Sequence, residues 1–147
     1  MNGSTWSNLG DIYHREGRLA EEIAAWQRAA DLRHRPESEL LSLGYAELAA
    51  RRPREALKAF DRASAILPQP AKPADNAFLA NLAHGRAISW NELEDVNRAI
   101  AFEEETLRLA PNRASDWLDL ARLYDREQRV EDAQRARARA TAIHGTQ

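Results

Sequence analysis

The sequence predicts an all-helical fold in which four helix pairs stack as a repeating array. The first observation is a period of 34 residues, which separates Gly10 from Gly44 and Ala29 from Ala63. The second is a helical spacing of apolar residues within the period, and the third is the placement of prolines between periods. A single helix pair cannot bury its apolar face, so neighbouring pairs must supply the core. With 147 residues the chain can form one short array of this kind.

The first period shows the helical spacing most clearly. One face of its first helix carries, at positions i, i+3, i+4 and i+7, the residues Trp6, Leu9, Gly10 and Tyr13. Gly10 removes a side chain where a neighbouring helix must approach closely, and Gly17 suits a left-handed helix end. We therefore expect helices over residues 5–16 and 20–33.

The same pattern returns along the chain. It is repeated near the C-terminus by Trp117, Leu120, Ala121 and Tyr124. Prolines, which interrupt helices, fall between the periods at Pro36, Pro68 and Pro111. We expect six further helices, over residues 38–50, 53–67, 75–91, 95–109, 114–127 and 130–143. The chain would then be one domain, 1–147, with units at approximately 3–36, 37–70, 71–113 and 114–147.

The third unit carries nine extra residues, because Ala56 and Ala99 lie 43 positions apart instead of 34. These residues must lie between Pro68 and Ala99, since the spacing is regular on both sides. The segment 68–73 contains three prolines and cannot continue a helix. We expect this loop to hold about half of the insertion, and a first helix lengthened from Asp75 to hold the rest.

The period and these motifs resemble the tetratricopeptide repeat (TPR) family over nearly the whole chain. The resemblance implies a right-handed superhelical solenoid of four helix-turn-helix units, with the first helix of each unit lining a concave groove. It also implies a protein–protein interaction module that binds a peptide or helix of a partner protein in that groove. Three residues depart from the family pattern: Glu22 stands at a small-residue position, and Glu47 and Arg137 at aromatic positions.

Composition excludes several other classes of function. The absence of cysteine excludes disulfides, thiolate metal sites and a cysteine nucleophile. A net charge of -2 does not favour nucleic acid or an anionic membrane as a partner. No apolar run is long enough to span a membrane, and the absence of signal-peptide features favours a cytoplasmic location.

No motif indicates an enzyme, a metal site or a cofactor. The four histidines, His14, His34, His84 and His144, include no pair at i+3 or i+4. No nucleophile–base arrangement is recognisable. The run Glu103–Glu105 is interpreted as a solvated helix face, because consecutive helical residues point in different directions.

The second unit carries an additional apolar stripe that the other units lack. Leu41, Tyr45 and Leu48 follow one another at i, i+4 and i+7. By family geometry this stripe faces the groove, as do Ser7, Asp11 and His14 in the first unit and Arg122 in the fourth. Three interpretations stay open: the long third unit covers the stripe, a peptide binds to it, or it forms a dimer contact.

Some TPR proteins hold acidic chaperone tails with a clamp of Lys, Asn and Arg. Ser7 and Asp11 stand at the corresponding places here, and neither is cationic. The resemblance therefore disfavours a chaperone-tail adaptor.

Trp90 has two interpretations. It is either a core residue that closes the longer third helix pair, or an aromatic anchor at the groove edge.

The chain as a whole has an alternative function as well, as a structural or oligomerisation domain of a larger multidomain protein. A homo-oligomer would fit either function.

Overall fold

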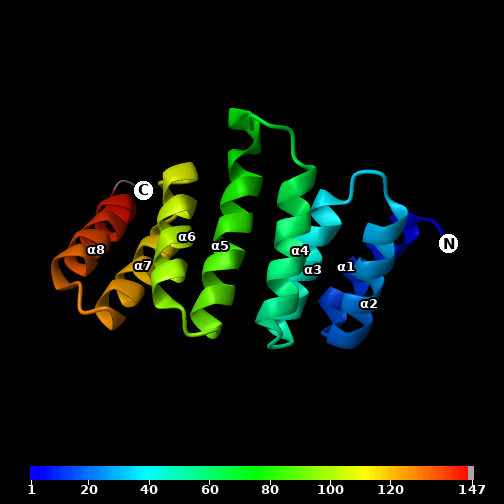
Figure 1. Ribbon diagram of the computed structural model, residues 1–147, viewed down its shortest axis with the longest axis horizontal. Helices are drawn as coiled ribbons and strands as arrows, with labels where there is room; N and C mark the ends of the chain where they lie inside the picture. The colour runs from blue at the N-terminus through cyan, green and yellow to red at the C-terminus, as the bar shows by residue number, and fades with distance from the viewer. Residues whose placement is uncertain (146–147) are drawn as a thin grey trace. The chain divides into compact units, whose positions relative to one another are not determined.

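The computed structural model describes residues 1–145, and over these residues it contains eight α-helices, one short 3-10 helix and no strand (Figure 1). The helices are α1 (Gly3–Glu16), α2 (Leu19–Leu32), α3 (Glu37–Ala49), α4 (Pro53–Ile66), η1 (Pro73–Asp75), α5 (Asn76–Glu92), α6 (Val96–Leu109), α7 (Ala114–Arg126) and α8 (Val130–Gly145). The eight predicted helices are confirmed, with each end within two residues of its predicted position. No helix in this range is long and apolar enough to cross a membrane.

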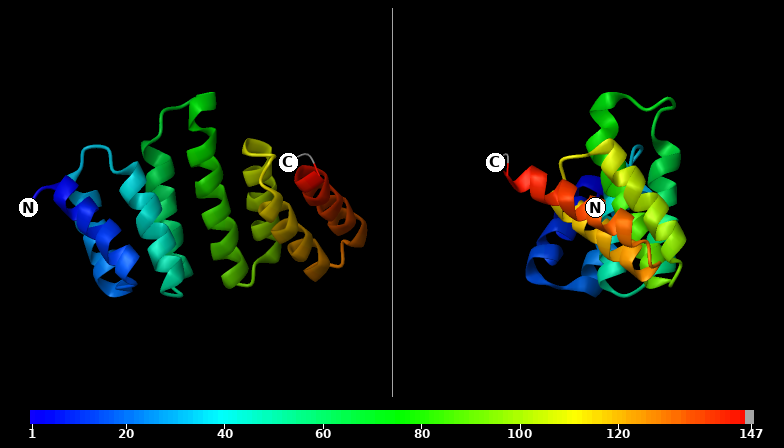
Figure 2. Two further views of the ribbon diagram at one scale, coloured as in Figure 1. Left: turned by 180° about the vertical axis from the view of Figure 1, so that it is seen from behind. Right: turned by 90° about the vertical axis from the view of Figure 1, so that its left-hand side faces the viewer.

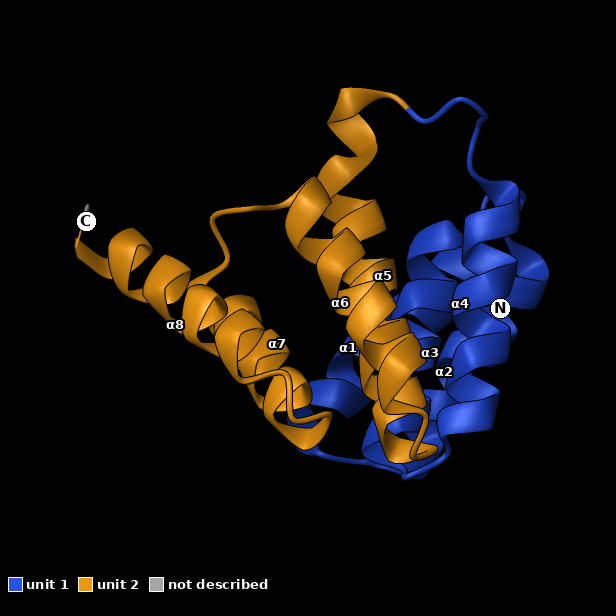
Figure 3. Ribbon diagram, turned by 60° about the vertical axis from the view of Figure 1, so that its left-hand side comes forward, with its two compact units in different colours: residues 1–71 blue, residues 72–147 orange. Residues whose placement is uncertain are grey.

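The chain forms two compact units, which meet in sequence at Ala71 (Figure 3). Unit 1 holds α1 to α4, and unit 2 holds η1 and α5 to α8. Within each unit every helix packs on the next helix of the chain, and the two helices of each pair run antiparallel (Figures 1 and 2). Each unit therefore corresponds to two of the predicted repeats.

Four equivalent turns close the helix pairs and fix the register of the repeats. One residue in each turn has a left-handed backbone conformation: Gly17 (φ 70°), Arg51 (φ 61°), Glu94 (φ 63°) and Gln128 (φ 58°). The next backbone N–H donates, over 2.9 Å in every turn, to the carbonyl of Tyr13, Glu47, Trp90 or Tyr124. A left-handed residue followed by such a hydrogen bond is typical of helix C-termini, where the bond satisfies one of the last backbone carbonyl groups.

The turns align the third repeat, whose first helix matches the sequence pattern poorly. Trp90 takes the position of Tyr13 and Tyr124. The insertion therefore lies before the aligned part of α5. The connection between α4 and α5 runs over nine residues, 67–75, and α5 has 17 residues where α1 has 14. The predicted division of the insertion between a loop and a longer helix is confirmed.

The core of unit 1 is built around two aromatic rings that pack on glycines. A methyl group added to Gly10 would lie 2.6 Å from Cε2 of Trp26, and Gly44 meets the ring of Phe60 even more closely. Trp26 is 6% exposed and Phe60 is fully buried. In both helix pairs of unit 1, a glycine is thus required on the first helix because a ring from the second helix covers it.

The core of unit 2 lacks such rings at the equivalent positions. Residues of unit 2 correspond to those of unit 1 after two periods of 34 residues and the nine inserted ones. By this register Glu103 is the counterpart of Trp26, and Arg137 is the counterpart of Phe60. Aliphatic residues of α6 and α7, with Tyr124, form the core, and Trp90 and Trp117 pack against it. Glu103, which replaces this ring, lines a pocket at the surface of unit 2.

Candidate functional site

Unit 2 contains a pocket of about 360 Å³ formed by α5, α6 and α7. Its walls combine aliphatic, amide, acidic and basic side chains from the three helices: His84, Ala87, Ile88, Asn91, Glu103, Asp119, Arg122, Leu123 and Arg126. It is therefore a concave site that can hold one side chain of a partner, with polar groups available to orient it.

The pocket exists because two positions of the repeat have changed together. In unit 1, Trp26 covers Gly10 and fills this space. In unit 2 the counterparts are Glu103 and Ala87, which both line the pocket. A glutamate is much smaller than a tryptophan, so it leaves a space that the ring would occupy.

A buried polar cluster forms the inner wall of the pocket. Nδ1 of His84 lies 3.1 Å from Oε2 of Glu103 and 3.7 Å from Oδ1 of Asp116. Glu103 is 2% exposed and Asp116 is 5% exposed, whereas His84 is partly open to the pocket. The hydrogen bond to Glu103 raises the pKa of His84, and burial raises the pKa of the Glu103 carboxyl group.

The interpretation of the acidic run as a solvated face is wrong for its first residue. Glu103 points inward, toward His84 of the preceding helix. Glu104 accepts a hydrogen bond of 2.7 Å from the hydroxyl of Tyr124, and Glu105 pairs with Arg108 at the surface. Three consecutive glutamates thus have three different environments, as helical geometry requires.

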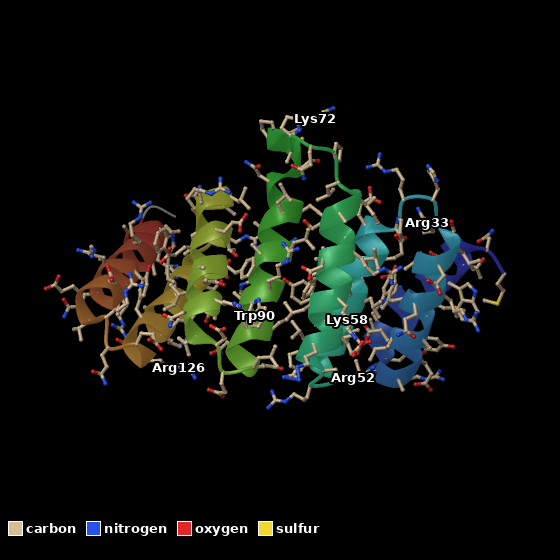
Figure 4. The ribbon with its side chains drawn as sticks, viewed as in Figure 1. Arg33, Arg52, Lys58, Lys72, Trp90 and Arg126 are labelled. Atoms are coloured by element: carbon tan, nitrogen blue, oxygen red, sulfur yellow. The ribbon has the colours of Figure 1, made fainter. Side chains whose placement is uncertain are left out.

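The rim of the pocket carries two arginines, and the guanidinium group of each already pairs with a carboxylate. Arg122 forms an ion pair with Asp119 on the same helix. Arg126 bonds to Asn91 and, over 2.8 Å, to Glu94. Figure 4 shows Arg126 and Trp90 toward the same end of unit 2, near the turn between α5 and α6. These pairs fix the rim side chains, and Ile88 and Leu123 provide apolar surface between them.

Of the residues that the sequence placed on the groove face, Arg122 lines this pocket. Sequence reasoning missed its neighbours on α5, namely His84, Ile88 and Asn91. They are the counterparts of Ser7, Asp11 and His14, which were singled out in the first unit. The register of α5 was the missing signal, because this helix has Ala83, Arg86 and Ala87 where α1 has Trp6, Leu9 and Gly10.

At the corresponding place in unit 1 the ring of Trp26 lies on Gly10. Ser7 is half-buried, and its hydroxyl donates to Oε1 of Glu39 over 2.9 Å. His14 is exposed, and its Nδ1 lies 2.9 Å from Oε1 of Glu22. Asp11 is exposed. Ser7 therefore links α1 to α3, and His14 links α1 to α2.

The apolar stripe of α3 is more deeply buried than expected. Leu48 is 7% exposed, and Leu41 and Tyr45 are half-buried. The ring of Tyr45 meets the core ring of Phe60 edge to face, with centroids 5.3 Å apart and planes at 72°. The stripe therefore belongs in part to the packing of unit 1, since Leu48 is a core residue and Tyr45 packs on Phe60, whereas partner binding by the stripe stays a prediction.

Trp90 is half-buried and packs on the core of unit 2. The guanidinium of Arg98 covers its ring at 4.4 Å from the centroid. Tyr13 under Arg18 and Tyr124 under Arg129 show the same arrangement at the equivalent position. A packing role for Trp90 is thus visible in the structure, and its use as an anchor stays a prediction.

Comparison with family models gives no match, and comparison with curated proteins gives none either. Solved structures do resemble the chain. MamA is 18% identical, with a TM-score of 0.86 over 99% of this chain and 80% of its own. YrrB, described as a TPR protein with an unusual peptide-binding site, is 14% identical, with a TM-score of 0.78 over 96% of this chain and 68% of its own.

A third structure is the first TPR domain of Spaghetti (RPAP3) bound to an HSP90 peptide. It is 16% identical, with a TM-score of 0.75 over 86% of this chain and 94% of its own. At these identities the likeness shows the fold alone. The chain has the TPR fold, a solenoid of helix-turn-helix repeats, as the sequence motifs predicted.

Proposed function

We propose that this chain is a protein–protein interaction module, and that a segment of its partner lies on the α5–α7 surface of unit 2. The observation that carries the proposal is the pocket at Glu103, where both repeats of unit 1 hold a core aromatic ring. One solved structure of the same fold is described as bound to an HSP90 peptide, and another as having an unusual peptide-binding site, which is consistent with this use.

The composition of the pocket supports binding of a peptide over catalysis. Ile88 and Leu123 offer apolar surface, while Asn91 and Arg122 can orient a peptide through hydrogen bonds. The described residues around the pocket include no serine, threonine or lysine that could act as a nucleophile beside His84. An interaction module, and not an enzyme, is therefore the function that this site supports.

The groove residues of unit 1 extend the proposal to a second contact surface. Asp11 and His14 on α1 and Leu41 on α3 are at least partly accessible. Ser7, Tyr45 and Leu48 are held mainly by contacts within the unit. We propose that the accessible residues of unit 1 add affinity, and that the pocket of unit 2 provides specificity.

Selection of random peptides on the intact chain tests the proposal. Ile88→Glu and Arg122→Glu should each weaken binding of a selected peptide by at least about tenfold. Val130→Glu is a matched control, because Val130 is 57% exposed on α8 of the same unit and lies outside the pocket. Circular dichroism of each variant verifies the fold.

Two outcomes would contradict the proposal: failure to select any peptide, or unchanged affinity in both pocket variants. Self-association that the same pocket variants abolish would favour the oligomerisation domain instead. Sedimentation of the unliganded chain distinguishes that alternative.

A further inference from the structure

Three potential metal ligands, one from each of α5, α6 and α7, converge at the pocket, which His84 and Glu103 line. They are Nδ1 of His84, the carboxylate of Glu103 and the carboxylate of Asp116, and one ligand atom of each lies within 4.8 Å of the others. Among the residues that the structure describes, this is the one such group of three.

The separations within the cluster suit a shared ion. Two ligands about 2.1 Å from a tetrahedral metal ion stand roughly 3.4 Å apart. Nδ1 of His84 lies 3.1 Å from the Glu103 oxygen and 3.7 Å from the Asp116 oxygen, so the observed values bracket this distance. The three ligand atoms all lie within 4.8 Å of one another, so they would move closer together to share one ion.

Asp116 is a buried carboxylate whose Oδ1 faces His84 and whose Oδ2 faces Arg113. Its Oδ2 is buried and has no hydrogen-bond partner. Arg113 lies 3.6 Å from this oxygen, beyond a hydrogen bond, and is itself held by Asn81 over 2.7 Å. Two carboxylates buried together are costly unless a positive charge compensates them. A dication would supply that charge in addition to Arg113, because His84 is neutral when its Nδ1 binds a metal ion.

We propose that His84, Glu103 and Asp116 form a binding site for a divalent transition metal ion of the Zn²⁺ type. One imidazole nitrogen and two carboxylates suit zinc and the neighbouring transition metals, whereas Mg²⁺ and Ca²⁺ prefer oxygen ligands alone. The pocket gives the ion access, because both His84 and Glu103 line it. Water or a side chain of a partner could reach such an ion from the pocket, which two of its three ligands line.

Unit 1 provides an internal control for this site. His14 and Glu22 form a histidine–glutamate pair with a separation of 2.9 Å, similar to His84 and Glu103. No third carboxylate joins that pair among the described residues. Glu39, the counterpart of Asp116, is engaged by Ser7 and by Arg33 at 2.9 Å each. The third ligand therefore distinguishes the site of unit 2 from an ordinary surface pair.

Calorimetric titration of the intact chain, first stripped with a chelator, tests the site with Zn²⁺ alone and with Co²⁺ alone. We expect one saturable site, together with the visible absorption that Co²⁺ shows in a low-coordinate environment. Asp116→Asn and His84→Ala should each weaken binding by at least about tenfold. His14→Ala should leave it unchanged. This measurement uses no partner, so its result is independent of the peptide-binding proposal.

Absence of saturable binding would overturn the inference and leave His84 as a protonated partner of the two carboxylates. Retained binding in both Asp116→Asn and His84→Ala would overturn it equally, because the ion would then be held elsewhere. Asp116→Asn keeps the shape of the side chain, so it answers the question even if His84→Ala fails to fold. A helical spectrum for Asp116→Asn without metal verifies that point.

Discussion

The two units have the same helices and the same turns, yet they differ at the one place where two helices of a pair come closest. In unit 1, Trp26 lies on Gly10, and the space between α1, α2 and α3 is filled. In unit 2 the pair is Glu103 and Ala87, and both line a pocket together with the half-buried His84. The comparison teaches that this fold uses an aromatic position either for stability or for a site.

The largest effects should follow from removing the rings of unit 1. Trp26→Ala and Phe60→Ala should each lower the free energy of unfolding by about 3–5 kcal/mol, through lost burial and a cavity. Glu103→Ala in unit 2 should cost less, about 1–3 kcal/mol, since His84 can lose its proton and reach water. Denaturant unfolding measures these differences. Equal losses at Trp26 and Glu103 would break the comparison.

The free energy of unfolding should depend on a glycine at the helix–helix contact of unit 1, Gly10, but not at its counterpart in unit 2, Ala87. Gly10→Ala should cost about 1–3 kcal/mol, because the added methyl group overlaps the Trp26 ring. Ala87→Gly, the reverse change at the counterpart, should cost only the helix propensity of about 1 kcal/mol. Thermal unfolding of both variants is the measurement. A neutral Gly10→Ala would show that the ring can move aside.

Tyr45 and its counterpart Arg122 should respond differently to the same substitution. Tyr45→Ser should lower stability by about 1–3 kcal/mol, because the ring packs edge to face on Phe60. Arg122→Ser should change stability by less than about 0.5 kcal/mol, since Arg122 is exposed. Chemical denaturation checks both. If Tyr45→Ser is neutral, the stripe of α3 is free surface as the sequence suggested.

The smallest effect concerns the turns, which are alike in both units. Gln128 holds a left-handed conformation at φ 58°, whereas Gly17 fills the equivalent position in the first turn. Gln128→Gly should stabilise the chain by up to about 1 kcal/mol, and Gly17→Ala should destabilise it by a similar amount. Urea denaturation of both variants measures these two changes in the free energy of unfolding. Destabilisation by Gln128→Gly would mean that the side chain contributes more than the strain costs.

The sequence predicted the helices well because their signals are local. The spacing of Trp6 and Tyr13, the left-handed end at Gly17 and the prolines between units each act within a few residues. The insertion before α5 was also predictable, from the interval between Ala56 and Ala99. These features together define the fold without any knowledge of long-range contacts.

The candidate site was not predictable in the same way. His84, Glu103 and Asp116 are far apart in the sequence and meet only when α5, α6 and α7 pack. The interval between Ala56 and Ala99 places Glu103 opposite Phe60, but the register of α5 is needed to see that His84 faces Glu103, and the sequence pattern of α5 hides that register. A run of three glutamates also resembles a solvated face until helical packing turns one of them inward.

The measurement that tests the central claim most directly transfers the pair of unit 1 into unit 2. In the double variant Ala87→Gly/Glu103→Trp the ring should fill the pocket. A peptide selected on the native chain should then bind at least about tenfold more weakly, while the helical spectrum and the cooperativity of unfolding persist. Ile88→Glu serves as a second test should the double variant fail to fold. Full affinity in a folded double variant would contradict the account, because the peptide would then bind elsewhere.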